Sequence, residues 1–140
     1  MRPVRQKKQA LKAEVNKEQI QTLGKAFWKL AHHYTFTREE QAILLGIKFN
    51  KERLIALQKK NEIPAEPDKM QRVGNLLGIH KNLRILFPED KELVYSWMHT
   101  PHKMFENKTP MDFVAEDFVN SFFRLFVIRQ KLDMFRVSGF

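Results

Sequence analysis

The stretch Arg84–Asp112, RILFPEDKELVYSWMHTPHKMFENKTPMD, decides how this chain folds. An apolar helix end meets a Pro-Glu-Asp break, and a short helix is expected to follow over Glu89–Met98. Two Thr-Pro pairs, Thr100-Pro101 and Thr109-Pro110, then come nine residues apart. A Thr-Pro pair is typical of a helix start, because threonine caps free amides and proline fits the first helical position. Each pair therefore predicts the beginning of a helix.

Outside this stretch the apolar residues recur at the spacing of three and four that is typical of amphipathic helices. We expect these helices over residues 17–33, 38–45, 51–60, 68–87, 110–115 and 119–135. No segment alternates strictly enough to predict a sheet, so the predicted fold is all-α with about seven helices.

Local signals fix several helix ends and faces. Thr37-Arg38-Glu39-Glu40 is a capping box, and Gly46 suits the left-handed residue that ends that helix. Asp68 is expected to cap the long helix, on which Gly74 and Gly78 share one face and would let another helix approach closely. On the last helix the side chains expected on or near the core side are Phe122, Phe123, Phe126 and Ile128.

The net charge of +9 is concentrated in one part of the chain. Residues 1–60 hold 14 Lys and Arg against 5 Asp and Glu, whereas residues 61–140 hold 11 of each kind. This imbalance favours a polyanion-binding part joined to a part with another task. A solvated basic tail is the alternative interpretation.

Several classes of function have no support in the sequence. There is no cysteine, which excludes a disulfide framework and a thiolate zinc site, and the pairs His32-His33 and His99/His102 lack the geometry of a metal site. We therefore expect no metal and no other cofactor. No phosphate-binding glycine loop or nucleophile elbow occurs, so no enzymatic activity is expected. The basic N-terminus lacks the apolar core of a secretory signal, and residues 118–128 are too short to span a bilayer. We expect a cytoplasmic protein that does not enter membranes.

Helix 38–45, Gly46 and helix 51–60 have the layout of a helix-turn-helix, in which the start of the second helix reads base edges. The residues there suit operator DNA, since Asn pairs with adenine and Arg or Lys with guanine; they are Lys48, Asn50, Lys51 and Arg53. Leu54 comes about two residues late for a standard unit. The turn is lengthened, the unit has lost its DNA register, or the two helices are ordinary packed helices. Operator-binding proteins of this kind are usually two-fold dimers, so we expect a homodimer.

The C-terminal segment Ile128–Phe140 mixes basic residues with Leu, Met, Val and Phe. Apolar anchors beside arginines are common in protein interfaces. The segment is therefore either a partner-binding element or a helix end that packs on the body.

Taken together, five ordered features resemble the Xre/MbcA/ParS-like toxin-binding antitoxin family over about residues 34–136. They are the capped helix-turn-helix, the Arg84–Pro88 turn, Trp97, Thr109-Pro110 and the ending Arg129…Leu132-Asp133…Arg136. The resemblance implies an N-terminal part that binds an operator and a C-terminal domain that binds a cognate toxin. That toxin usually has a RES domain and acts on NAD, and the antitoxin covers its active-site entrance.

Residue by residue, the resemblance assigns Trp97, Phe105, Thr109 and Pro110 to the framework of the toxin-binding domain. Arg129, Leu132, Asp133 and Arg136 match the motif expected to face the toxin, and Phe135 lies among them. The family usually has Gly-Gly-Arg where this chain has Glu106-Asn107-Lys108, and an aromatic residue where it has Lys131. Glycine favours left-handed or closely packed backbone, which would be harder to form here.

The predicted organisation is a basic flexible arm over residues 1–15, a helix-turn-helix-like DNA-binding part over residues 16–66 and a helical toxin-binding domain over residues 67–140. Three functions remain open. The chain is an antitoxin of a RES-domain toxin that also binds its operator, a stand-alone helix-turn-helix regulator without a toxin, or a toxin-binding protein whose helix-turn-helix has degenerated.

Overall fold

The computed structural model describes residues 4–138, and the side chains of residues 17–138. In this part of the chain the fold is all-α, as the sequence predicts. The α-helices are α1 (Val4–His33), α2 (Arg38–Leu45), α3 (Lys51–Lys60), α4 (Pro67–Leu86), α5 (Lys91–Ser96), α6 (Pro110–Ala115) and α7 (Ser121–Ser138). Two short 3-10 helices, η1 (Trp97–His99) and η2 (Lys103–Phe105), lie between α5 and α6. The side chains of the predicted basic arm, residues 1–15, lie outside the described ones, as does Phe140 at the other end.

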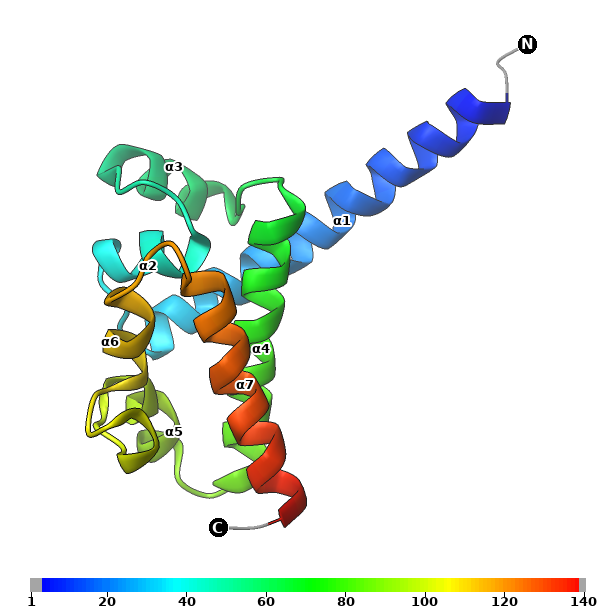
Figure 1. The fold of residues 1–140 in the computed structure, drawn as a ribbon. Helices are drawn as coiled ribbons and strands as arrows, with labels where there is room; N and C mark the ends of the chain where they lie inside the picture. Colours follow the sequence, from blue (N-terminus) through cyan, green and yellow to red (C-terminus); the bar gives the residue numbers. More distant parts are fainter. Residues whose placement is uncertain (1–3, 139–140) are drawn as a thin grey trace.

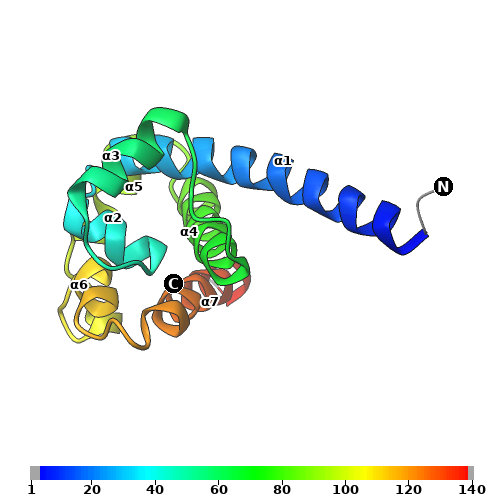
Figure 2. The same ribbon diagram turned by 90° about the horizontal axis from the view of Figure 1, so that it is seen from above.

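Helices α4 and α7 lie side by side and run in the same direction, which Figure 1 shows in green and orange to red. Contacts between residues 72 and 121 at one end and residues 82 and 133 at the other fix this parallel arrangement. The segment from α5 to α6 returns the chain from the end of α4 to the start of α7. Helices α2 and α3 lie near the first turns of α4 (Figures 1 and 2).

The N-terminal half of α1 extends away from the other helices in both views, whereas its C-terminal half packs against them (Figures 1 and 2). Phe27, Leu30 and Ala31 of that packed half are buried. The indole N–H of Trp28 donates a 2.7 Å hydrogen bond to the carbonyl of Glu62, just after α3. This bond holds the end of α3 against α1.

One cluster of buried apolar side chains joins all seven helices. Arg72 of α4 is also buried and donates hydrogen bonds to the carbonyl of Ile43 at 3.2 Å and to the hydroxyl of Ser121 at 2.9 Å. Its guanidinium thereby connects α4 with the end of α2 and the first residue of α7. The division into parts at residues 66 and 67 stays a prediction.

The predicted caps at four helix ends are confirmed. Thr37 accepts from the amide of Glu40 in a complete capping box, and Gly46 ends α2 with φ 71°. Asn50 caps α3, and Thr109 caps α6 by accepting from the amide of Asp112. These caps depend only on neighbouring backbone, which is why the local sequence predicts them.

Several predicted helix starts are wrong. Helix α1 begins at Val4 rather than at residue 17, so it includes most of the segment expected to be a flexible arm. Thr100-Pro101 begins no helix, because the Thr100 hydroxyl donates to the carbonyl of Ser96 and so binds the preceding turn. Helix α4 begins at Pro67, one residue earlier than expected, so Asp68 lies inside its first turn. Helix α5 begins at Lys91 because Asp90, expected inside the helix, caps it by accepting from the amide of Leu93.

The core-facing side of α7 differs from the prediction. Helix α7 begins at Ser121 rather than Val119, and its buried residues are Ser121, Leu125, Ile128 and Leu132. Phe123 and Phe126, expected near the core, are 62% and 44% exposed. A helix can turn only one stripe toward a core, and the stripe through Leu125 and Ile128 occupies it.

Candidate partner-binding surfaces

The segment between α5 and α6 is built around buried aromatic rings. Trp97 and Phe105 are 5% and 4% exposed, and the Trp97 ring lies 4.8 Å from the ring of His102, centroid to centroid. Pro110, the first residue of α6, is also buried. These residues therefore stabilise the fold of the segment and offer little surface to a partner.

A tight turn over Phe105–Lys108 contains two consecutive left-handed residues. Glu106 has φ 55° and Asn107 has φ 64°, and the amide of Lys108 donates to the carbonyl of Phe105 at 3.0 Å. This is the pattern of a type I′ turn, which favours glycine or asparagine at both central positions. The left-handed backbone inferred from the resemblance is thus present, although this chain has Glu and Asn in place of glycines.

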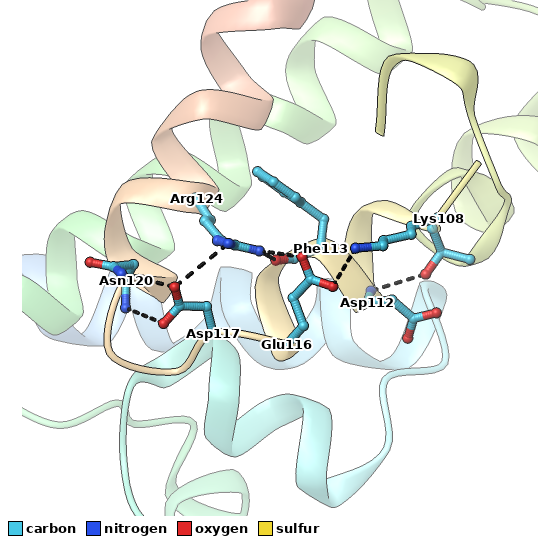
Figure 3. Close-up of polar contacts among 8 residues, drawn as sticks. Lys108, Asp112, Phe113, Glu116, Asp117, Asn120 and Arg124 are labelled. Carbon is cyan, nitrogen blue, oxygen red and sulfur yellow. Dashed lines mark hydrogen bonds and ion pairs between the residues drawn. The ribbon is translucent and has the colours of Figure 1, made fainter. Parts of the chain in front are cut away.

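Lys108, the last residue of the turn, belongs to a group of charged residues beside α6 and α7 (Figure 3). Glu116 accepts from Lys108 at 2.8 Å and from Arg124 at 2.6 Å. Arg124 also donates to the carbonyl of Phe113 at 2.7 Å, and its guanidinium lies 4.6 Å from the centre of that ring. Hydrogen bonds from Lys108 and Arg124 hold the pKa of the Glu116 carboxyl below its usual value.

Asp117 and Asn120 extend this group to the loop before α7 (Figure 3). The Asn120 side chain donates to Asp117 at 2.8 Å, and this bond lowers the pKa of the Asp117 carboxyl. Arg124 lies 3.5 Å from the same carboxylate. The charged group therefore fixes the loop between α6 and α7, and so positions the C-terminal helix.

Three of the residues expected to face a toxin lie where α7 meets α4. The buried side chain of Asn82 contacts both Asp133, at 2.8 Å, and Arg136, at 3.0 Å. Arg129 crosses Gly78, whose missing side chain leaves room for the guanidinium, and lies 3.3 Å from Asn75 Oδ1. These three polar side chains therefore hold α7 to α4.

The two apolar members of the expected set differ in exposure. Leu132 is only 2% exposed and belongs to the core. Phe135 is half-buried and packs against the same core. A partner could reach Phe135 directly, whereas Leu132 acts by packing α7 on the body.

The sequence interpretation missed the outer face of α7. Phe123, Phe126, Met134 and Val137 are 62%, 44%, 63% and 90% exposed. With Gln130 they follow one another at spacings of three and four residues, so they form one stripe opposite the buried stripe. That spacing is visible in the sequence, but it cannot by itself say which of two apolar stripes faces the core.

The four residues expected to bind DNA lie together at the start of α3 and are all exposed. Asn50 accepts from the amide of Arg53 at 3.0 Å, so its side-chain oxygen serves as a helix cap. Lys48, Lys51 and Arg53 leave their charges on the surface around it, and Phe49 beside them is 48% exposed. This end of α3 is a basic surface with one aromatic ring.

An open groove of about 610 Å³ lies between the end of α1 and α5. His33 stacks on Tyr95 with ring centres 4.8 Å apart, and His99 lies 2.8 Å from Glu40 across the groove. Behind it, burial raises the pKa of the Tyr34 hydroxyl, which lies 2.8 Å from Nδ1 of His80. Within the described residues no group of three or more His, Asp or Glu side chains could hold a metal ion.

No helix in the described part of the chain is long and apolar enough to cross a membrane.

Two exposed surfaces among the described residues have the composition of binding sites. They are the basic start of α3 and the outer face of α7.

Comparison with known proteins identifies the central segment. Residues 82–119, from the end of α4 to the loop before α7, match the model of the antitoxin Xre/MbcA/ParS C-terminal toxin-binding domain. A curated relative, the uncharacterized protein y4oB of Sinorhizobium fredii (strain NBRC 101917 / NGR234), is 28% identical over 108 residues, 77% of this chain and 79% of the relative. No solved structure matches the chain. The match supports the antitoxin family, which is not an enzyme family, and implies a toxin as partner.

Proposed function

We propose that this chain is the antitoxin of a type II toxin–antitoxin system and neutralises a RES-type, NAD-directed toxin. Neutralisation works by occlusion: α7 covers the entrance to the toxin's active site and blocks access of the substrate. The match of residues 82–119 to the toxin-binding domain carries this proposal. The RES type of the toxin follows from the family resemblance alone.

The geometry around α7 agrees with this role. The charged group of Glu116 and Arg124 fixes the start of α7, while Asn82 fixes its last turns. A helix held at both ends loses little conformational freedom when it binds, which favours affinity. Of the residues assigned to the toxin, Arg129, Phe135 and Arg136 are accessible at least in part, Asp133 is exposed, and Leu132 supports the helix from the core.

A second part of the proposal concerns DNA. The start of α3, with Lys48, Asn50, Lys51 and Arg53, binds the operator of the chain's own operon as part of a cytoplasmic homodimer. The exposure of all four residues and the excess of positive charge in residues 1–60 support it. Phosphate contacts by such residues supply affinity and base contacts supply specificity.

Expression with the product of the neighbouring gene tests the antitoxin role. We expect that product to stop growth and to deplete NAD when it is expressed alone, and to do neither when this chain is present. The two proteins should also purify together as a complex. A neighbouring product that neither binds this chain nor loses toxicity would contradict the proposal.

Truncation separates the antitoxin from a stand-alone regulator. Removal of residues 129–140 should abolish neutralisation. The deletion also removes the buried Leu132 from the core, so DNA binding is compared where circular dichroism shows that the remaining helices stay folded, and there it should be intact. A regulator without a toxin would instead keep its whole biological effect after this truncation. A degenerate helix-turn-helix would give neutralisation without any affinity for the operator.

A further inference from the structure

The outer face of α7 is an apolar stripe with no partner in the described structure. Its members are Phe123, Phe126, Met134 and Val137, with Gln130 at its centre. Solvent-exposed apolar side chains at consecutive turns of one helix are a common mark of a protein-binding surface. Scattered single residues would need no such explanation.

Basic residues border this stripe on both sides. Helix α7 carries four basic side chains, at positions 124, 129, 131 and 136, and one acidic side chain, Asp133. Arg129 and Arg136 contact α4 on one side, and Arg124 contacts α6 on the other. The stripe is therefore bordered on both sides by basic side chains, of which Arg124 is paired with Glu116 and Asp117, and α7 itself carries three more positive than negative charges.

The charge of α7 distinguishes between possible occupants. A second copy of this chain that docked the same face would bring two basic helices together, and like charges at an interface are unfavourable. A partner whose apolar surface is rimmed by carboxylates would complement both the stripe and its borders. Charge complementarity thus favours a different, acidic protein over a second copy.

We propose that the outer face of α7 is the toxin-docking surface and that the toxin meets it with an apolar patch surrounded by Asp and Glu. This inference rests on the proposed function and specifies its interface. Phe123, Phe126, Met134 and Val137 supply the apolar anchors. Arg129, Lys131 and Arg136 lie at the rim, where charges mainly set the rate of association.

Continuity along the chain supports this assignment. Phe118 and Val119, which are 46% and 88% exposed, lie at the end of the segment that matches the toxin-binding domain. Helix α7 starts two residues later. Exposed apolar side chains therefore occur at the end of the matched segment and again along the helix that follows it.

Single substitutions on the stripe test the proposal in the full-length chain. Met134→Glu and Phe123→Glu place a charge on the surface and should leave thermal unfolding unchanged. Leu93→Glu on α5, at a position 36% exposed, is the matched control. Affinity for the neighbouring gene product should fall at least tenfold in the two stripe variants, as expected for interface anchors, and stay at the wild-type value in the control.

The rim gives an independent measurement. Lys131→Glu should slow association with the same protein and weaken its dependence on salt, because the partner's rim is acidic. Faster association would overturn the assignment of an acidic partner.

Each remaining outcome is decisive. If the wild-type chain binds the neighbouring gene product and both stripe variants bind it equally well, the docking surface is wrong and the proposed function stands. If the wild-type chain does not bind that product, the proposed function fails and this inference fails with it. If sedimentation shows a wild-type dimer that Met134→Glu converts to a monomer, the face belongs to a second copy.

Discussion

The side-chain amide of Asn82 donates a 2.8 Å hydrogen bond to the carboxylate of Asp133. Asn82 is only 2% exposed, and its own oxygen accepts from Arg136 at 3.0 Å. One buried amide on α4 therefore holds two of the side chains of α7 that the family resemblance assigns to the toxin. Their position makes them important for the stability of the helix before any partner arrives.

Asp133→Ala should lower the free energy of unfolding by about 1 kcal/mol, because it removes the acceptor of a partly buried hydrogen bond. Asp133→Asn keeps an oxygen that can accept from Asn82, so its loss should be smaller. Asn82→Ala removes both bonds and should cost more than either, roughly 1–3 kcal/mol. Urea denaturation of the three variants measures these differences. Equal stability of Asp133→Ala and the wild type would contradict the role of Asn82.

A second prediction concerns the turn over Phe105–Lys108. Glu106 has φ 55°, a conformation that glycine adopts without a steric penalty. Glu106→Gly should raise the free energy of unfolding by roughly 0.5 kcal/mol, since relief of the left-handed conformation exceeds the entropy gained by the unfolded chain. Asn107→Gly should gain less, because asparagine tolerates this region better than most residues.

The urea midpoints of these variants should be compared with that of Lys103→Gly, at a nearby position without positive φ. That control should destabilise the protein. A lower midpoint for Glu106→Gly than for the wild type would show that the turn carries no strain at this residue.

Local sequence predicted much of this fold because many of its determinants are local. The caps at Thr37, Asn50 and Thr109 each bind an amide three residues away. Thr100 is followed by proline as Thr109 is, yet its hydroxyl donates back to Ser96. The difference arises from the closing turn of η1, which no pattern of threonine and proline describes.

The candidate site was less predictable, because it depends on which face of a helix meets the core. Helix α7 has apolar residues on two opposite faces, and the choice between Leu125 and Phe126 depends on α4, far away in the sequence. The resemblance directed attention to Arg129–Arg136, which lie on the same helix as the exposed stripe. Only the packing against Gly78 and Asn82 distinguishes the side that holds α7 in place from the side left open.

Glycines in two helices give a third prediction. A Cβ at Gly24 of α1 would overlap the backbone carbonyl of Asn61, which cannot move without displacing the end of α3. A Cβ at Gly74 of α4 would meet nothing within 4 Å. Gly24→Ala should therefore cost about 1–3 kcal/mol through overpacking. Gly74→Ala should add about 0.5–1 kcal/mol, because alanine is the better helix former.

Thermal unfolding should show a lower stability for Gly24→Ala and a higher stability for Gly74→Ala. The sequence suggested that both Gly74 and Gly78 allow close approach, and the structure supports this only for Gly78, which faces Arg129. Destabilisation by Gly74→Ala would mean that Gly74, like Gly78, is needed for a close approach.

His80 makes stability depend on pH. Burial, together with the nearby charges of Arg84 and His33, holds the pKa of His80 below its usual value of 6.5. The unfolded chain therefore binds a proton at higher pH than the folded protein does. The contribution of neutral His80 to the free energy of unfolding is complete above about pH 6.5, and it is lost as the pH falls below that value.

Thermal midpoints at pH 7.5 and pH 5.5 measure this effect. The wild type should lose more stability than His80→Gln over that interval, and the two should respond alike between pH 7.5 and 8.5. The same loss in both proteins at pH 5.5 would assign the acid sensitivity to other groups.

The last prediction concerns the basic start of α3. Lys51→Ala with Arg53→Ala should greatly weaken binding to a fragment of the chain's own promoter, because both side chains are exposed at the proposed DNA surface. Lys59→Ala with Lys60→Ala removes the same charge from the exposed C-terminal end of the same helix and serves as the control. If only net charge matters, the two double variants will bind equally.

Salt dependence distinguishes direct phosphate contacts from a general electrostatic attraction. Each phosphate contact releases counterions and contributes about −0.9 to the slope of log affinity against log salt. If Lys51 and Arg53 both contact phosphates, their removal should make the slope shallower by about 2, whereas the Lys59 and Lys60 control should keep the wild-type slope. A loss of affinity without a change of slope would mean that these side chains contact bases instead. Wild-type protein with no affinity for the promoter would leave α2 and α3 as ordinary packed helices.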